Sequence, residues 1–166
     1  MTKEEARKIA KLIRINRKYN QEELDKLLIQ KIKELNAKTI AIFYPLANEF
    51  DLRILMKYFS VCFPKTKGDF LEFYLNPSKF KKGKFSVYEP CDGLLIDKKD
   101  IDLMFVPALC VNKKNFRIGY GKGYYDRYLE NSNIYTISIV YNDLVLDFLE
   151  DSFDVKVNEV ILWNKL

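Results

Sequence analysis

The chain contains no histidine among its 166 residues. A Ser-His-Asp or Cys-His nucleophile, a histidine general base and the common histidine-containing zinc sites are therefore excluded. An enzyme with this composition has to work through positioning, electrostatics, magnesium and carboxylates. Phosphoryl transfer relies most on those means, because the protein mainly orients the reacting groups and neutralises developing charge.

Cysteines and long apolar runs are also scarce. The three cysteines, Cys62, Cys91 and Cys110, are odd in number and far apart, so we expect buried, reduced thiols. No apolar run approaches the ~20 residues that cross a bilayer, and the lysine-rich start lacks the apolar core of a signal peptide. We therefore expect a cytoplasmic protein that contacts no membrane.

Length and composition favour one globular domain over residues 1–166, with 48% hydrophobic and 31% charged residues. Helical and strand patterns alternate along the chain, which predicts an α/β fold. We expect three layers, with a largely parallel, Rossmann-like sheet flanked by helices and a β-hairpin near residues 70–88.

The individual elements follow from local patterns. Thr2 and Glu5 form a capping box that starts a helix with Ala6, Ile9, Ala10 and Ile13 on one stripe. A second helix starts near Asn20 and is expected to bury Leu24, Leu27, Leu28 and Leu35. Asp51 is expected to cap a helix through Phe59. Strands are expected near residues 39–44, 61–63, 70–75, 85–88, 102–106, 134–140 and 157–163.

The most informative segment is residues 117–129, RIGYGKGYYDRYL. Glycines at every second position disfavour strand and helix interiors, so Gly119, Gly121 and Gly123 mark a loop whose backbone passes close to another group. A helix over residues 124–130 follows, with Tyr125, Tyr128 and Leu129 on one face. The predicted order of strand, glycine loop and helix N-terminus is typical of a phosphate site.

Charged residues in this segment support the same interpretation. Lys122 is a mobile cation, Arg117 and Arg127 offer forked donors to phosphate, and Asp126 is placed to hold magnesium shared with ATP. The loop is not a Walker loop, because Gly123 follows Lys122, nor a dinucleotide fingerprint, because Tyr124 is not small. The alternative is a glycine-rich turn capped by an aromatic core helix.

The distribution of charge is uneven, although the net charge is only +5. Residues 65–84 hold six lysines against two acids, whereas residues 142–166 hold six acids against two lysines. Such a dipolar surface suits an anionic small molecule better than a nucleic-acid track. For the lysines at 79–84, a solvated loop is the alternative.

Several motifs, taken in order, resemble the 5-formyltetrahydrofolate cyclo-ligase family, also called 5,10-methenyltetrahydrofolate synthetase. They are KEEAR near the start, FYPLANE after the first predicted strand, FPK near Pro64, YEP near Pro90, VP before the loop, and RIGYGKGYYDRYL. The resemblance runs nearly from end to end. Only the last motif is highly specific by itself.

The resemblance implies a role for each matching residue. ATP would contact Lys3, Arg7, Arg117, Ile118, Gly119, Tyr120, Gly121, Lys122, Gly123, Tyr124 and Tyr125. The folate would contact Arg7, Glu49, Tyr120, Gly121, Lys122, Gly123 and Tyr124. Lys122, Arg117 and Tyr124 would be the catalytic residues. Asp126 and Asp154 would hold Mg²⁺, with the alignment around Asp154 the looser of the two.

The implied reaction is the ATP- and Mg²⁺-dependent closure of 5-formyltetrahydrofolate to 5,10-methenyltetrahydrofolate. Transfer of the γ-phosphoryl group to the formyl oxygen creates a leaving group, folate N10 attacks the carbon, and ADP and phosphate are released. The expected partners are ATP and a folate that carries one or more glutamates, with no nucleic acid, and the chain is expected to be a monomer.

Two alternatives belong to other classes. One is a protein that binds single-stranded nucleic acid through basic and aromatic residues, and the other is a nucleotide sensor without turnover. The chain also departs from the usual family pattern at Asn112, where an acid is common, at Asn115, where glycine is common, and at Trp163 and Asn164 in place of Thr-Glu. Asn115 is compatible with a left-handed backbone.

Overall fold

The computed structural model describes residues 1–163 of the chain, so Asn164 and the end of the predicted domain lie outside the described residues. The helices are α1 (Lys3–Arg14), α2 (Gln21–Leu35) and α3 (Tyr124–Leu129), with short 3₁₀ turns η1 (Arg53–Lys57), η2 (Lys84–Ser86), η3 (Lys98–Asp100) and η4 (Asn142–Leu144). The strands are β1 (Thr39–Ala41), β2 (Ser60–Lys67), β3 (Phe70–Leu75), β4 (Phe80–Lys82), β5 (Tyr88–Pro90), β6 (Leu94–Ile96), β7 (Leu103–Phe105), β8 (Cys110–Val111), β9 (Arg117–Ile118), β10 (Tyr135–Tyr141) and β11 (Glu159–Trp163).

The main sheet has the strand order β11-β10-β7-β1-β2-β3-β6. Its five strands from β11 to β2 are parallel, and β3 and β6 are added antiparallel at one edge. Two small antiparallel pairs, β4-β5 and β8-β9, lie outside this sheet. The predicted largely parallel sheet is confirmed, and β4-β5 supplies a hairpin in the predicted region.

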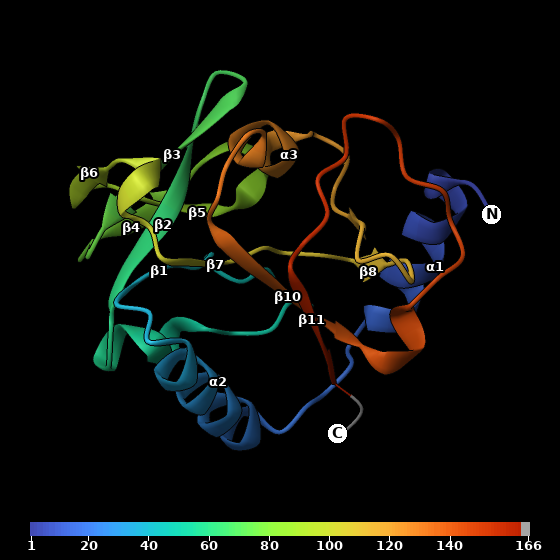
Figure 1. Ribbon diagram of the computed structural model, residues 1–166, viewed down its shortest axis with the longest axis horizontal. Helices are drawn as coiled ribbons and strands as arrows, with labels where there is room; N and C mark the ends of the chain where they lie inside the picture. Colours follow the sequence, from blue (N-terminus) through green and yellow to red (C-terminus); the bar gives the residue numbers. More distant parts are fainter. Residues whose placement is uncertain (164–166) are drawn as a thin grey trace.

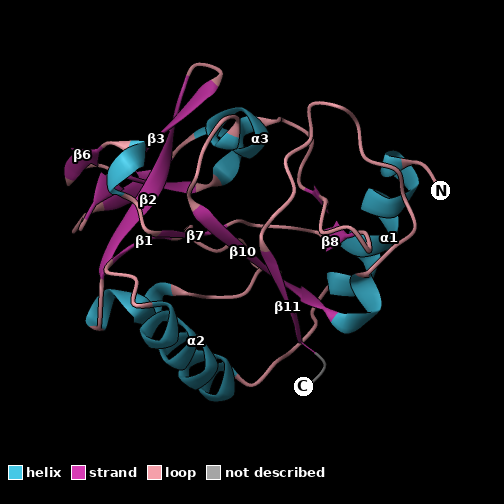
Figure 2. Cartoon of the chain, viewed as in Figure 1, coloured by secondary structure: helices cyan, strands magenta, loops and turns pink. Residues whose placement is uncertain are grey.

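Helices cover both faces of the sheet (Figure 1). One core cluster joins α1, α2 and η1 to the sheet through residues such as Ala6, Leu28 and Leu55. The second cluster lies on the opposite face and includes Leu129 of α3. This three-layer arrangement (Figure 2) confirms the predicted architecture.

Both N-terminal helices begin where their caps predict. The Thr2 hydroxyl accepts a hydrogen bond from Glu5 N–H at 3.1 Å, and the Asn20 amide oxygen accepts one from Glu23 N–H at 3.1 Å. The buried stripe of α2 is Leu24, Leu28 and Ile32. Leu27 and Leu35, predicted to be buried, are 39% and 38% exposed, because only one narrow face of α2 packs on the sheet.

Three predicted elements differ from the structure. The first strand ends at Ala41 rather than Tyr44, because the chain turns away towards Pro45. Asp51 accepts a hydrogen bond from Arg53 N–H, but Leu52 holds the cap position, and only the short turn η1 follows in place of a helix through Phe59. Residues 84–86 form η2 where a strand was expected, with Phe85 and Ser86 in the left-handed region, and β5 begins at Tyr88.

The structure tests the expected burial of the cysteines and the expected lack of a membrane-spanning segment. Cys62 and Cys110 are buried and unpaired, whereas Cys91 is exposed, so the expectation of burial was wrong for Cys91. Among the helices of residues 1–163, none combines the length and apolar character that a bilayer crossing requires.

Candidate active site

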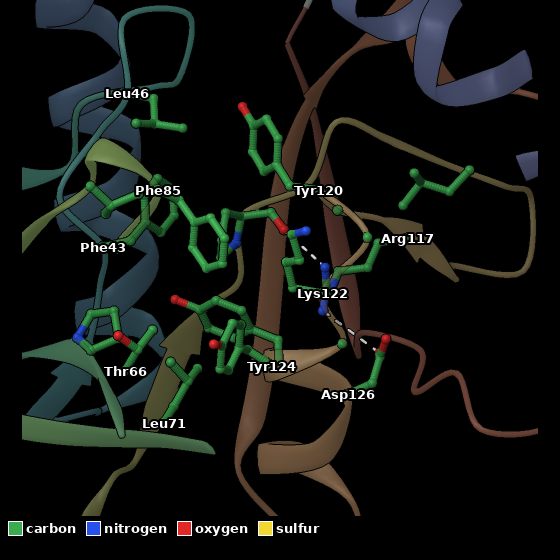
Figure 3. A pocket seen from close by; sticks show the side chains of 18 of the residues that line it. Phe43, Leu46, Thr66, Leu71, Phe85, Arg117, Tyr120, Lys122, Tyr124 and Asp126 are labelled. Atoms are coloured by element: carbon green, nitrogen blue, oxygen red, sulfur yellow. Dashed lines mark hydrogen bonds and ion pairs between the residues drawn. The ribbon is translucent and has the colours of Figure 1, made fainter. Parts of the chain in front are cut away.

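A cavity of about 670 Å³ opens between the sheet, α1 and the start of α3. Every residue predicted to bind ATP, substrate or metal lines it: Lys3, Arg7, Glu49, residues 117–126 and Asp154. The loops that follow β1 and β7 meet here, as expected for the carboxyl ends of parallel strands. Figure 3 shows Phe43, Leu46 and Phe85 facing Tyr120, Lys122 and Tyr124 across the opening.

The glycine loop leaves its backbone donors free. Among the hydrogen bonds within residues 1–163, none uses the N–H groups of residues 119–123. Gly121 and Gly123 have φ values of +92° and +70°, which residues with a side chain rarely adopt. A Cβ on Gly119 would lie 2.9 Å from Arg117 Nη1. The glycines therefore allow a tight path along which several amides remain available as donors to a ligand.

Arg117 lies beneath this loop at the start of β9, not within the loop as its motif suggested. Its guanidinium is almost fully buried, Nη1 donates to the Pro107 carbonyl at 3.2 Å, and Nη2 lies 3.6 Å from Asp126 Oδ1 (Figure 3). Arg117 Nε has no partner within residues 1–163. Burial lowers the pKa of Arg117. The site thus holds an incompletely bonded cation, which an anion would stabilise.

Helix α1 brings two further cations to the cavity. Arg7 Nε donates to the Gly119 carbonyl at 3.1 Å, and the guanidinium lies close to Gly121. Lys3 pairs with Asp151 at 2.7 Å and also with Asp154. Burial opposes a charge on Lys3, but the two carboxylates outweigh it and raise its pKa. Lys3 and Arg7 are one turn apart and converge on the same cavity wall, as predicted.

The two carboxylates predicted to bind metal are each held by the protein. Asp126 Oδ1 accepts a hydrogen bond from Val155 N–H at 3.2 Å, and Asp154 Oδ2 accepts one from Asp151 N–H at 2.7 Å. The second oxygen of each carboxylate has no hydrogen-bond partner within residues 1–163. Both acids line the same cavity, although no cluster of three metal-ligating side chains occurs in the described part of the chain.

Glu49 lies on the opposite wall, in the loop after β1. Its Oε1 accepts a hydrogen bond from Leu46 N–H at 2.7 Å, which fixes the carboxylate within its own turn. Burial raises the pKa of Glu49, while this hydrogen bond and the nearby Arg14 guanidinium oppose the rise. A partly buried carboxylate in an apolar cavity is suited to accept N–H groups of a flat heterocycle.

Two basic features differ from the sequence interpretation. Arg127 does not line the cavity: it donates to the carbonyls of Lys122 and Asp69, both at 2.9 Å, and so braces the loop against the β2-β3 turn. Of the lysines at 79–84, only Lys84 reaches the cavity wall. Lys81 lies opposite Glu89 in the β4-β5 pair, and Glu89 lines the cavity.

The comparison with protein families decides the assignment. The model of the 5-formyltetrahydrofolate cyclo-ligase family matches residues 2–162. The chain belongs to this family. A 5-formyltetrahydrofolate cyclo-ligase of Mycoplasma genitalium is 31% identical over 156 residues, covering 89% of this chain and 83% of the relative. A Haemophilus influenzae protein of the same name is 28% identical over 140 residues, covering 76% of this chain and 75% of the relative.

Solved structures agree with this membership. The 5,10-methenyltetrahydrofolate synthetase of Aquifex aeolicus, solved by NMR, gives a TM-score of 0.77 at 28% identity and covers 98% of this chain and 90% of its own. The synthetase of Mycoplasma pneumoniae gives a TM-score of 0.79 at 25% identity, covering 97% and 98%. The cyclo-ligase fold therefore accounts for nearly all of this chain.

Part of the wall of this cyclo-ligase cavity was missed by sequence reasoning. The missed residues are Phe43, Tyr44, Leu46, Pro64, Thr66, Leu71, Phe85, Val87, Glu89, Pro107, Asp151 and Phe153. Glu89 is buried and accepts hydrogen bonds from Thr66 N–H at 2.8 Å and Thr66 Oγ1 at 2.9 Å. The FPK and YEP motifs signalled this region, but only β-pairing shows that they meet.

Proposed function

We propose that this chain catalyses the ATP-dependent cyclisation of 5-formyltetrahydrofolate to 5,10-methenyltetrahydrofolate, with release of ADP and phosphate. Family membership carries the reaction and its two substrates. The single structural observation that supports it best is the set of N–H groups of residues 119–123, none of which donates a hydrogen bond within residues 1–163, between the cations Lys3, Arg7 and Arg117 and a largely apolar wall. This arrangement suits a polyphosphate next to a flat, partly apolar ring.

The phosphates of ATP would lie along the glycine loop. Lys3 and Arg7 approach from α1, Arg117 from below and Lys122 from the loop itself. Residues 118–125 supply the backbone amides and the aromatic side chains of Tyr120, Tyr124 and Tyr125. The loop amides and the cations together would neutralise the charge of the γ-phosphoryl group during its transfer.

Mg²⁺ fits this site on the chemistry of its donors. Magnesium is usually held by one or two carboxylates together with substrate phosphates and water. Asp126 and Asp154 each retain an oxygen without a hydrogen-bond partner within residues 1–163 and would serve as those carboxylates. The ion would supply charge neutralisation at the phosphates. The contact of Lys3 with Asp154 would then exchange for contacts with phosphate.

The folate would occupy the apolar wall. Glu49 would accept the paired N–H donors of the pterin ring, and Tyr120 and Tyr124 would provide aromatic faces for stacking. Arg7 and residues 121–123 stand between the two ligands and would contact both. Placed in this way, the formyl oxygen approaches the γ-phosphate beside Lys122.

The reaction then proceeds in two steps at the formyl carbon. The formyl oxygen takes the γ-phosphoryl group from ATP, which converts a poor leaving group into phosphate. Folate N10 attacks the activated carbon and loses its proton to water, the C–O bond breaks, and phosphate departs with the bonding electrons as the methenyl bridge forms. Lys122 and Arg117 stabilise the transferring phosphoryl charge, and Tyr124 contacts the reacting groups. No covalent bond to the protein is formed, which agrees with the absence of histidine.

The remaining expectations extend this proposal. We propose a single domain that acts as a monomer, since one chain brings all the residues predicted to bind ATP, folate and Mg²⁺ to the same cavity. We also propose that the lysines at 79, 81, 82 and 84 attract the anionic tail of polyglutamylated folates, because Lys84 lines the cavity and β4, which carries Lys81 and Lys82, pairs with β5, whose Glu89 also lines it.

An absorbance experiment tests the reaction directly. The purified chain is incubated with 5-formyltetrahydrofolate and Mg-ATP, and the near-ultraviolet band of the methenyl product is followed. We expect the band to grow with stoichiometric release of ADP and to be absent without ATP. ADP release without the methenyl band would indicate a nucleotide hydrolase, and nucleotide binding with neither product would indicate a sensor.

A further inference from the structure

Arg14, at the end of α1, is a buried cation that none of the motifs singled out. It is 5% exposed, and it takes part in none of the ion pairs within residues 1–163. Its Nη2 donates to the Asn48 carbonyl at 2.8 Å, directly before Glu49 in the chain. Asn16 N–H also bonds the Asn48 side chain at 3.3 Å. The end of α1 is thus fastened to the loop that carries Glu49.

Burial of a guanidinium without an ion pair lowers the stability of the fold unless a nearby anion offsets its charge. Arg14 and Glu49 line one small void behind the main cavity, together with Phe43 and Phe105. The Arg14 charge opposes the rise of the Glu49 pKa that burial causes. Together with the larger effect of the Leu46 N–H hydrogen bond, the Arg14 charge therefore favours the charged form of the carboxylate, which accepts N–H donors.

The other groups around Glu49 do not supply this charge. Tyr120 from the glycine loop and Tyr125 from α3 feel the Glu49 carboxylate, and burial raises the pKa of both phenols, so both stay neutral at moderate pH. Cys110 of β8 lies near Arg14, and burial raises its pKa to about 12. Among the described residues, Arg14 is the cation whose charge reaches Glu49.

Arg14 lies on the same helix, α1, as the two cations Lys3 and Arg7. Lys3, Arg7 and Arg14 are separated by four and seven residues, so they share one face of the helix over about 16 Å. Lys3 and Arg7 lie at the phosphate end of this face, and Arg14 lies at the end near Glu49. One rigid helix therefore spans both halves of the cavity.

We infer that Arg14 is a positioning residue for substrate recognition, which fixes the loop of Asn48 and Glu49 and places a cation behind the Glu49 carboxylate for binding of the folate ring. The inference rests on the proposed function, because it assigns Glu49 to the folate. It places Arg14 behind the carboxylate, out of contact with substrate. Its removal should weaken folate binding while sparing ATP binding and the chemical step.

Steady-state kinetics of three variants test this inference between about pH 5 and pH 7.5. Arg14→Met should raise KM for 5-formyltetrahydrofolate by about tenfold, with kcat and KM for ATP changed by less than about twofold. Its acid limb of kcat/KM for the folate should move to higher pH, because the pKa of Glu49 rises without the cation. In Glu49→Gln this limb should vanish. Arg17→Met is the matched control, since Arg17 pairs with Asp143 outside the cavity.

Two further variants separate this role from a structural one. Adding Arg14→Met to Glu49→Gln should cost less than about twofold beyond Glu49→Gln alone, because the two residues act as one unit. Arg14→Lys keeps the charge, so its acid limb should stay at the wild-type pH, and this variant carries the test if Arg14→Met does not fold. Equal losses for ATP and folate, additive losses in the double variant, or an acid limb in Arg14→Lys that moves to higher pH would overturn the inference.

The activity of the wild-type chain separates a failure of the proposed function from a failure of the role of Arg14. A wild-type chain that forms no methenyl product removes the proposed function. A fully active wild type with an Arg14→Met variant of unchanged folate KM and pH profile removes only the role of Arg14.

Discussion

The most telling single residue is Arg117, a buried guanidinium with incomplete partners. Its Nε is unbonded within residues 1–163, and its cationic plane lies 5.4 Å from the Tyr125 ring centroid. Asp126 at 3.6 Å offsets its charge only loosely. Burial of such a cation is stabilised by a bound anion, so Arg117 links nucleotide binding to the stability of the site.

Lys122 and Asp126 test the phosphate site at this scale. We expect Lys122→Ala to lower kcat about a hundredfold, because one donor to the transferring charge contributes about 3 kcal/mol. Asp126→Ala should lose most turnover as well and should require more Mg²⁺ for its remaining activity. Initial rates from the methenyl band, with titration of Mg²⁺, measure both effects.

Lys113→Ala is the matched control, because Lys113 is an exposed lysine that does not line the cavity. Circular dichroism should show the same folded state for all three variants. Near-normal kinetics in Lys122→Ala and Asp126→Ala would contradict the assignment of the loop.

Single residues also show what sequence reasoning can and cannot reach. Asn115 has φ +68°, as expected for asparagine in place of glycine, because the requirement is local. For Asn112 the sequence shows only a departure from the usual family pattern, which has an acid at this position. In the structure its amide donates to the Phe148 carbonyl at 3.2 Å and its oxygen accepts from Lys114 and Phe116 N–H. A carboxylate could not make the first bond, and only the fold reveals it.

At the scale of elements, helix starts were predictable and strand lengths were not. The caps Thr2 and Asn20 accept hydrogen bonds from N–H groups three residues away, so the local sequence alone predicts where each helix begins. The strand β1 spans only three residues, because its pairing with β2 and β7 decides its length. The predicted strand at 85–88 failed for the same reason: β5 is defined by its partner β4.

The two caps provide a paired test of what α1 does. Thr2→Ala and Asn20→Ala should each lower the free energy of unfolding by about 1 kcal/mol. Only Thr2→Ala should also raise KM for ATP, by a few fold, because α1 carries Lys3 and Arg7 into the cavity whereas no residue of α2 lines it. Urea denaturation and ATP titrations of the rate measure the two quantities.

Equal ATP effects in both variants would mean that general destabilisation, and not the frayed start of α1, changes nucleotide binding. An unchanged KM for ATP in Thr2→Ala, with the expected loss of stability, would remove Lys3 and Arg7 from the nucleotide site.

For the whole molecule, the cavity depends on segments that are distant in sequence. Residues 3–7, 43–49, 64–89, 117–126 and 151–154 all contribute to its walls. The segments with charged or glycine motifs were predicted, since those residue types indicate phosphate chemistry by themselves. The apolar wall was missed, because Phe43, Leu71 or Phe153 look like ordinary core or surface residues until the sheet brings them together.

The uneven charge distribution of the whole molecule predicts where the anionic tail of the folate binds. The lysines at 79, 81, 82 and 84, called the rim lysines, are exposed, and Lys84 lines the cavity. Replacing all four with glutamine should raise KM for a polyglutamylated folate about five- to tenfold at low salt and KM for the monoglutamate less than about twofold.

This difference should shrink as salt is added, because exposed charges are screened over about 10 Å at 0.1 M. A control with glutamine at Lys18, Lys33, Lys38 and Lys113 has the same net charge, and none of those exposed residues lines the cavity. If that control weakens polyglutamate binding equally, net charge alone attracts the tail. If the rim variant affects both folates alike, the rim lysines contact the body of the substrate and the tail points elsewhere.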